Sequence, residues 1–156
     1  MTESSSYASH PEYLPDFMND PRDEDGRQVV KLDLAENSAL AAASLNRFAA
    51  ATGDVIDFES APYEERLWWD DEDHWARMAA ELLSSYVQQG ERVAVIWGNY
   101  VMPTVTMPAD VAVRHARDIL DAGPHFWICP LGHSVLIECL MDGQVTVAKI
   151  PRRYVI

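Results

Sequence analysis

The stretch YEERLWWDDEDHWARMAAELLSSY, residues 63–86, decides how the rest of the chain is interpreted. It holds three of the five tryptophans of the chain and seven of its 25 acidic residues. From Trp75 to Tyr86 apolar side chains recur at spacings of three and four, which predicts one buried face of an amphipathic helix. Asp70 or Asp71 is the predicted N-cap of that helix, and Gly90 is its predicted end.

Outside this helix, the sequence shows further strand and helix patterns. A second helix is predicted from Asn37 or Ser38 to Gly53, and a third over 110–122. Strands are predicted over 28–34, 92–97, 101–107, 125–129, 134–140 and 144–150, with a further short strand pattern at 54–58. Because the strands gather late in the chain, we expect an α+β fold, with a mixed or mainly antiparallel sheet of about six strands packed with three helices.

The chain divides by composition into an N-terminal tail, residues 1–26, and a single α+β domain, residues 27–156. Prolines, a serine run and an acidic block oppose regular structure in the tail, which we expect to be acidic and flexible. Within it the run 13–18 is apolar enough to dock, either on its own domain or on a partner. The tail has no apolar segment of the secretory type, so we expect a cytoplasmic protein. No run is long and apolar enough to predict a membrane span.

Net charge is −13, and it is unevenly distributed. Residues 1–91 carry 20 acids and six bases, a balance of −14, whereas residues 92–156 carry five acids and six bases, a balance of +1. Nucleic acid is an unfavourable partner, because phosphate binding requires clustered Lys and Arg. The acidic half is compatible with plain solubility or with electrostatic steering toward a basic protein.

Two sets of residues suggest metal binding at first sight. Asp70, Asp73 and His74 share one face of the predicted helix, but helix capping explains these carboxylates without a metal. The second set is His125, Cys129, His133 and Cys139, which lack the short paired spacing typical of zinc sites. We therefore expect neither a metal nor another cofactor.

No nucleophile, phosphate-binding or metalloprotease motif is present in the sequence. A small enzyme or ligand-binding domain remains an alternative, with a pocket between sheet and helices. His115 with Asp118, or His125 with His133, would supply its acid–base groups.

Trp68 and Trp69 are adjacent, so both cannot face the same way, and we expect one to stay partly exposed beside the acids. An aromatic anchor within a polar rim is typical of protein interfaces. We therefore expect a non-enzymatic protein that binds a basic protein partner through the segment before the helix and its first turn. The candidate residues are Asp57, Glu59, Glu64, Glu65, Trp68, Trp69, Asp70, Asp71 and Asp73.

The run 66–75, the hairpin 93–107 and the closing segment HFWICPLGHSVLIECLMDGQVTVAKI, residues 125–150, together resemble a known group of proteins. These are the immunity proteins of bacterial contact-dependent growth inhibition and other polymorphic toxin systems. The resemblance implies a neutraliser that blocks the active site of a basic, nuclease-type toxin. An acidic mimic of DNA is a further alternative, and it would need carboxylates spaced like phosphates along one face.

Overall fold

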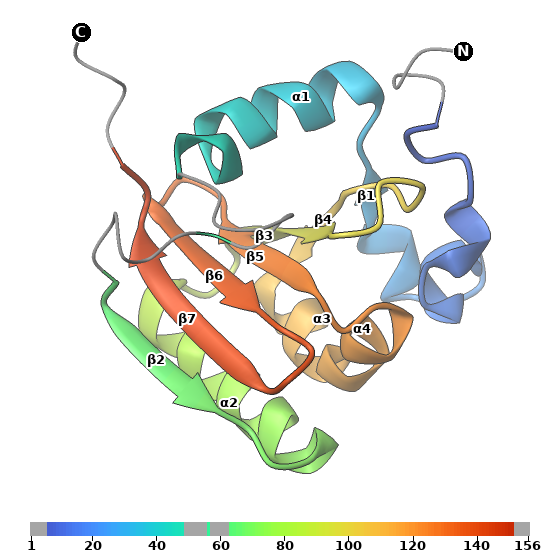
Figure 1. Ribbon diagram of the computed structural model, residues 1–156. Helices are drawn as coiled ribbons and strands as arrows, with labels where there is room; N and C mark the ends of the chain where they lie inside the picture. The colour runs from blue at the N-terminus through green and yellow to red at the C-terminus, as the bar shows by residue number, and fades with distance from the viewer. Residues whose placement is uncertain (1–5, 49–55, 57–62, 152–156) are drawn as a thin grey trace, which may run out of the picture.

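The computed structural model describes residues 6–48, 56 and 63–151 (Figure 1). Within these ranges the chain forms one antiparallel sheet in the order β1-β4-β3-β5-β6-β7-β2. The seven strands are β1 (Val30–Lys31), β2 (Glu65–Trp68), β3 (Arg92–Trp97), β4 (Val105–Pro108), β5 (Phe126–Pro130), β6 (Val135–Cys139) and β7 (Gln144–Lys149). The α-helices are α1 (Leu34–Ala43), α2 (Glu72–Tyr86), α3 (Ala109–Arg114) and α4 (Ala116–Ala122).

The α+β class is confirmed, with one strand more than expected and four helices instead of three. The added strand is β2, which pairs with β7 and forms one edge of the sheet. The expected third helix is two helices, because the backbone at His115 leaves helical geometry between α3 and α4. Of the short strand pattern at 54–58, only Ile56 lies within the described residues, where it forms an isolated bridge.

Helices cover the sheet on both sides (Figure 1). Side chains alternate between the two faces along each strand, as the pleat requires. In β3, Val93 and Val95 belong to the larger core beneath α2, α3 and α4. Ala94 and Ile96 face the smaller core on the side of α1. The two cores are therefore separated by the sheet itself.

The buried strand β3 and the meander β5–β6–β7 follow the sequence prediction closely. Asp142-Gly143 makes the predicted β6–β7 hairpin, and Gly143 has φ +97°, which favours glycine. The first strand is shorter than predicted and pairs with β4 at the other edge of the sheet. β4 itself starts at Val105 instead of residue 101, beyond Pro103, which cannot donate to a strand ladder.

The helix α1 begins before its predicted cap. Asp33 accepts a hydrogen bond from the Glu36 backbone N–H, and the Glu36 side chain accepts one from the Asp33 N–H, which makes a capping box. The helix ends at Ala43, where Ser44 turns the chain into the 3₁₀ turn η5 (Leu45–Arg47). The predicted end at Gly53 lies outside the described residues.

The N-terminal segment is packed onto the domain over its described residues. Two short 3₁₀ turns, η2 (Pro11–Tyr13) and η3 (Asp16–Asn19), bring Leu14, Phe17 and Met18 into the larger core. A third turn, η4 (Gly26–Gln28), closes the segment. Of the two docking places considered for the run 13–18, the structure shows the chain's own domain. Burial of three large apolar side chains offsets the prolines and acids that suggested a tail.

None of the helices in the described part of the chain combines the length and apolarity that crossing a bilayer requires.

Candidate functional site

The two adjacent tryptophans have different environments, as the sequence predicts. Trp68 is the last residue of β2 and is 56% exposed. Trp69 is partly buried and packs against the larger core. Its backbone N–H donates to the Gly143 carbonyl at 3.1 Å, which fixes the chain just after the edge strand. Of these two tryptophans, Trp68 is therefore the one whose side chain is available to a partner.

The acidic residues predicted as candidates between positions 57 and 73 have different structural environments. Asp71 is the N-cap of α2 and accepts a hydrogen bond from the His74 backbone N–H at 2.8 Å. Asp70 is exposed and lies 3.5 Å from the His74 ring. Glu64 is exposed and lies 3.6 Å from Lys149. Asp57 and Glu59 lie outside the described residues, and Glu65 is half-buried in β2.

The first turn of α2 meets a second source of negative charge that the sequence analysis missed. The side chain of Glu72 faces that of Asp121 in α4, and the interaction with this second carboxyl group raises the pKa of Glu72. The next residue of α2, Asp73, forms an ion pair with Arg117, which like Asp121 belongs to α4. The acidic residues of two helices are therefore held against each other.

Two tryptophans explain why α4 lies there. The Trp75 indole N–H donates to the Ala116 carbonyl at 2.8 Å, and the Trp97 indole N–H donates to the Ile119 carbonyl at 3.2 Å. Trp75 also meets Phe126 edge to face, with ring centroids 5.7 Å apart. These contacts tie α4 to α2 and to the sheet, and they bring the exposed side of α4 beside the start of α2.

A shallow hollow of about 280 Å³ extends this surface toward the N-terminal segment. Asp16 of η3 lines it from one side, and Asp118 and Asp121 of α4 line it from the other. The half-exposed ring of Tyr13 also borders it. We call the surface made by Asp16, Glu72, Asp73, Asp118 and Asp121 the α2–α4 acidic surface. Asp118 and Asp121 are three residues apart, a spacing that places them on one helix face and is visible in the sequence.

The N-terminal segment is held at this surface by a network around Asp25. Its carboxylate accepts two hydrogen bonds from Arg114, at 2.8 and 3.2 Å, and lies 2.8 Å from His115 Nε2. The Arg114 guanidinium, and secondly His115, lower the pKa of Asp25 to about 2. The His115 ring also stacks on Phe17, with centroids 3.7 Å apart.

The alternative acid–base pairs differ in geometry. His115 Nδ1 lies 3.0 Å from Asp118, so that pair is formed, but its other nitrogen is engaged by Asp25. His115 therefore links α4, through Asp118, to the N-terminal segment, through Asp25 and Phe17. His125 and His133 lie at opposite ends of β5 and are not brought together. His133 contacts Glu91 instead, at 2.9 Å.

The residues considered for metal binding do not converge. Cys129 belongs to the core on the α1 side of the sheet, and Cys139 belongs to the core on the other side. Over residues 6–48, 56 and 63–151, no three His, Cys, Asp or Glu side chains are arranged to hold a metal ion.

A buried carboxylate, Glu138, is the other polar feature that the sequence analysis missed. It is 1% exposed, and its Oε2 accepts hydrogen bonds from the Trp127 indole N–H and the Ile56 backbone N–H, both at 3.0 Å. Its Oε1 has no hydrogen-bond partner among the described residues. Burial raises the pKa of Glu138. A glutamate within the apolar run 135–139 is the sequence signal that would have indicated it.

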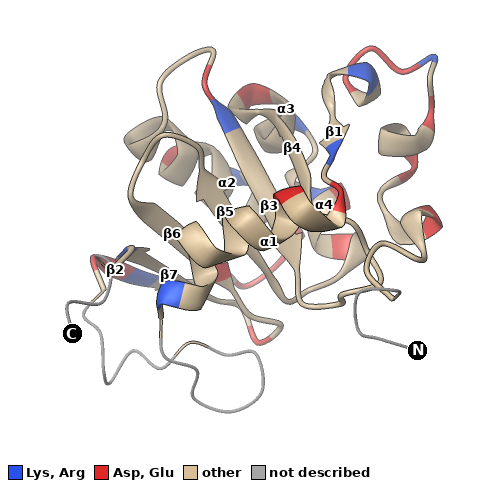
Figure 2. Ribbon diagram, turned by 90° about the horizontal axis from the view of Figure 1, so that it is seen from above, with Lys and Arg blue, Asp and Glu red and all other residues tan. Residues whose placement is uncertain are grey.

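Charge is unevenly placed over the described fold. Figure 2 shows acidic positions along the N-terminal segment and the loops, whereas α1 is uncoloured apart from its N-terminal end. The acidic surface and the face beneath α1 are thus different environments. Comparison with protein-family models and with curated proteins finds no match, so the assignment of these surfaces rests on the geometry of the chain.

Proposed function

We propose that this chain is a non-enzymatic acidic binding protein that neutralises a basic protein partner, as an immunity protein covering the active site of a nuclease-type toxin in the cytoplasm. The observation that carries the proposal is the convergence of carboxylates from three elements: Asp16, Asp118 and Asp121 line one hollow, and Glu72 faces Asp121. Two carboxyl groups from different helices are held together, with Arg117 as the nearby cation that offsets them. A lysine or arginine of a partner would relieve this repulsion on binding.

The hollow beside this pair has the chemistry to receive such a cation. Asp16, Asp118 and Asp121 supply carboxylates, and Tyr13 supplies an aromatic ring near the same space. A guanidinium or ammonium group gains from both kinds of contact. A nuclease active site is rich in such groups because it binds phosphates. The α2–α4 acidic surface would therefore compete with the nucleic acid for the same side chains.

Trp68 would serve as the anchor beside the charged surface. It is more than half exposed, and one residue separates it from the acidic run that begins at Asp70. Leu67 and Tyr63 are also exposed at the same edge of the sheet. Tryptophan and tyrosine are enriched among the residues that dominate binding energy at protein interfaces.

A toxicity assay tests the proposal. The basic nuclease domain of a toxin encoded next to this chain's gene is expressed with and without the chain, and cell survival and nuclease activity are measured. We expect the wild-type chain to restore survival and inhibit the purified nuclease at equimolar concentration. A chain that binds no neighbouring toxin and inhibits no nuclease would contradict the proposal.

A further inference from the structure

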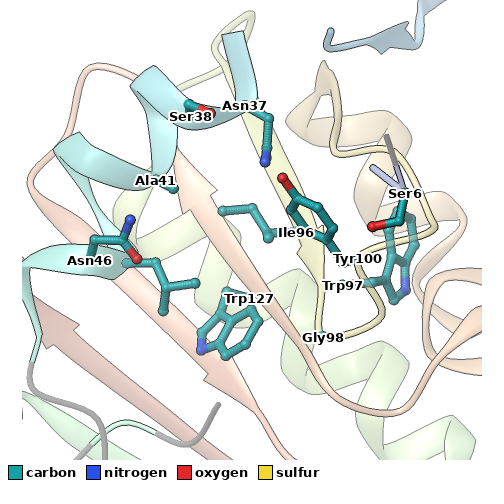
Figure 3. A pocket seen from close by; sticks show the side chains of 11 residues that line it. Ser6, Asn37, Ser38, Ala41, Asn46, Ile96, Trp97, Gly98, Tyr100 and Trp127 are labelled. Atoms are coloured by element: carbon teal, nitrogen blue, oxygen red, sulfur yellow. The ribbon is translucent and has the colours of Figure 1, made fainter. Parts of the chain in front are cut away.

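A separate cavity of about 560 Å³ lies between α1 and the sheet, on the face opposite the α2–α4 acidic surface (Figure 3). Asn37 and Ser38 line it from α1, Ile96 and Trp127 line it from the sheet, and Tyr100 lines it from the loop after β3. This volume is within the range of pockets that hold small organic molecules.

The side chain of Asn37 is fixed by a chain of hydrogen bonds. The Thr104 hydroxyl donates to Asn37 Oδ1 at 2.6 Å, and the Thr104 backbone N–H donates to the Tyr7 hydroxyl at 2.9 Å. The Tyr7 hydroxyl in turn donates to the Leu32 carbonyl at 2.9 Å. Because Asn37 Oδ1 is held by a donor, the amide orientation is set, and Nδ2 is left on the other side.

Asn37 Nδ2 is aimed into the cavity. Figure 3 shows this nitrogen pointing away from α1, toward Ile96 and the hydroxyl of Tyr100. Asn37 is only 8% exposed, and within residues 6–48, 56 and 63–151 no acceptor is bonded to its Nδ2. The cavity is open to solvent on this side, so the N–H₂ group is accessible and can donate to an acceptor that enters the cavity. A ligand that places an acceptor there would replace water as the partner of this donor.

The opposite wall of the cavity is apolar. The polar atom of Trp127, its indole N–H, is already bonded to Glu138, so the ring offers carbon surface. Ile96 lies beside it in the paired strand. The described residues that line the cavity include amides and hydroxyls but no Lys, Arg, His, Asp or Glu. This lining favours an uncharged ligand over an ion, because a buried charge needs a compensating partner.

We propose that this cavity binds an uncharged small molecule that joins a carbonyl acceptor to a flat apolar body. The carbonyl would accept a hydrogen bond from Asn37 Nδ2, and the apolar body would lie against Ile96 and Trp127. The site lies mainly on the other side of the sheet from the α2–α4 acidic surface, and Trp97, whose indole N–H donates to the Ile119 carbonyl of α4, also borders it.

Benzamide is a suitable probe because it combines one uncharged amide with one aromatic ring. A titration is followed by ¹H–¹⁵N NMR, reading the side-chain N–H₂ of Asn37 and the indole N–H of Trp127. We expect saturable shifts at both groups, with a dissociation constant on the order of 1 mM, as suits a fragment of this size. Benzoate, which carries a charge, and toluene, which lacks an acceptor, should each bind at least fivefold more weakly.

Two variants separate the parts of the site. Ala41→Phe places a ring in the cavity without touching the Asn37–Thr104 hydrogen bond, and it should weaken benzamide binding at least tenfold. Asn37→Asp keeps the acceptor for Thr104 but removes the N–H₂ donor, and it should also weaken binding. Ser84→Ala, on the exposed surface of α2, is the matched control and should leave binding unchanged.

The proposal is overturned if benzamide gives no saturable shift at Asn37 and Trp127, if benzoate binds as tightly as benzamide, or if Ala41→Phe binds like the wild type. Should Asn37→Asp fail to fold, the Ala41→Phe result alone decides between these outcomes.

Discussion

Trp68 and Trp69 are consecutive in the chain, yet Trp68 is mostly exposed, while Trp69 is partly buried against the core and its backbone N–H donates to the Gly143 carbonyl. The edge strand β2 ends between them, and the β6–β7 turn holds Trp69 in place. The pair therefore places a core side chain and a mostly exposed side chain next to each other in the chain.

This difference predicts opposite phenotypes for two alanine variants. Trp69→Ala removes a large side chain from the core and should lower the free energy of unfolding by about 2 kcal/mol or more. Trp68→Ala should change it by less than about 0.5 kcal/mol, because the side chain is mostly exposed. Urea denaturation of both variants checks this. Equal losses in the two proteins would mean that Trp68 is part of the core.

Gly143 should tolerate no side chain. Its φ of +97° disfavours any residue with a Cβ, and a Cβ built there would lie 2.7 Å from the Trp69 carbonyl oxygen. Gly143→Ala should therefore cost about 2 kcal/mol of unfolding free energy. Gly132→Ala is the matched control for backbone strain, because Gly132 has φ +83° and open space around it. A larger loss for Gly143→Ala than for Gly132→Ala is expected in thermal denaturation, and equal losses would refute the close approach to Trp69.

Glu138 predicts an unusual dependence of stability on pH. Since burial raises its pKa in the folded state, the folded chain binds this proton more tightly than the unfolded chain does. Its contribution to stability is therefore present below the unfolded pKa of about 4.3 and is lost as the pH rises through the folded pKa.

Glu138→Gln should remove that dependence. The glutamine carbonyl still accepts from the Trp127 indole and the Ile56 N–H, and the side chain stays neutral. We expect the unfolding free energy of the variant, minus that of the wild type, to increase from pH 4 to pH 7. Urea denaturation at several pH values measures the difference, with Glu81→Gln on the exposed side of α2 as control. A difference that is the same at every pH would show that Glu138 has an ordinary pKa.

For Asp25, we expect the opposite dependence of stability on pH. Its pKa is lowered to about 2 by Arg114 and His115, so its contribution is present above the unfolded pKa of about 3.9 and is lost as the pH falls toward 2. Asp25→Asn should destabilise the protein by about 1–2 kcal/mol at pH 7, because charge-assisted hydrogen bonds to Arg114 are weakened. The loss should shrink as the pH approaches 2, and a pH-independent loss would argue against the ion pair.

The parts of the fold that the sequence predicts are those whose signals are local. A few consecutive residues are enough to predict the cap and the apolar stripe of α2. The same holds for the Asp142-Gly143 hairpin. The strand β2 is missed because its four residues are stabilised as a strand by β7, far along the chain. For the N-terminal segment, the sequence indicates that the run 13–18 can dock, but it does not reveal the contacts that hold the segment, since Gly26 lies close to the Phe17 backbone and Asp25 reaches Arg114.

The candidate site divides in the same way. Trp68 and the acids of the α2 cap follow from the sequence, but Asp121 reaches Glu72 only because Trp75 and Trp97 hold α4 in place. The sequence does not reveal the environment of Asn37, because the donor that its Oδ1 faces, the Thr104 hydroxyl, is supplied by a loop far along the chain. Tertiary contacts between distant segments decide both sites.

The most direct test of the proposed function is the rate at which the chain associates with the basic toxin domain, measured at low and high salt. The double variant Glu72→Gln/Asp121→Asn removes the paired carboxyls and should fold at least as well, because it relieves their repulsion. We predict that it associates at least tenfold more slowly than wild type at about 50 mM salt, with a weaker salt dependence, whereas Glu81→Gln behaves as wild type. Association as fast as wild type, with an unchanged salt dependence, would contradict the account.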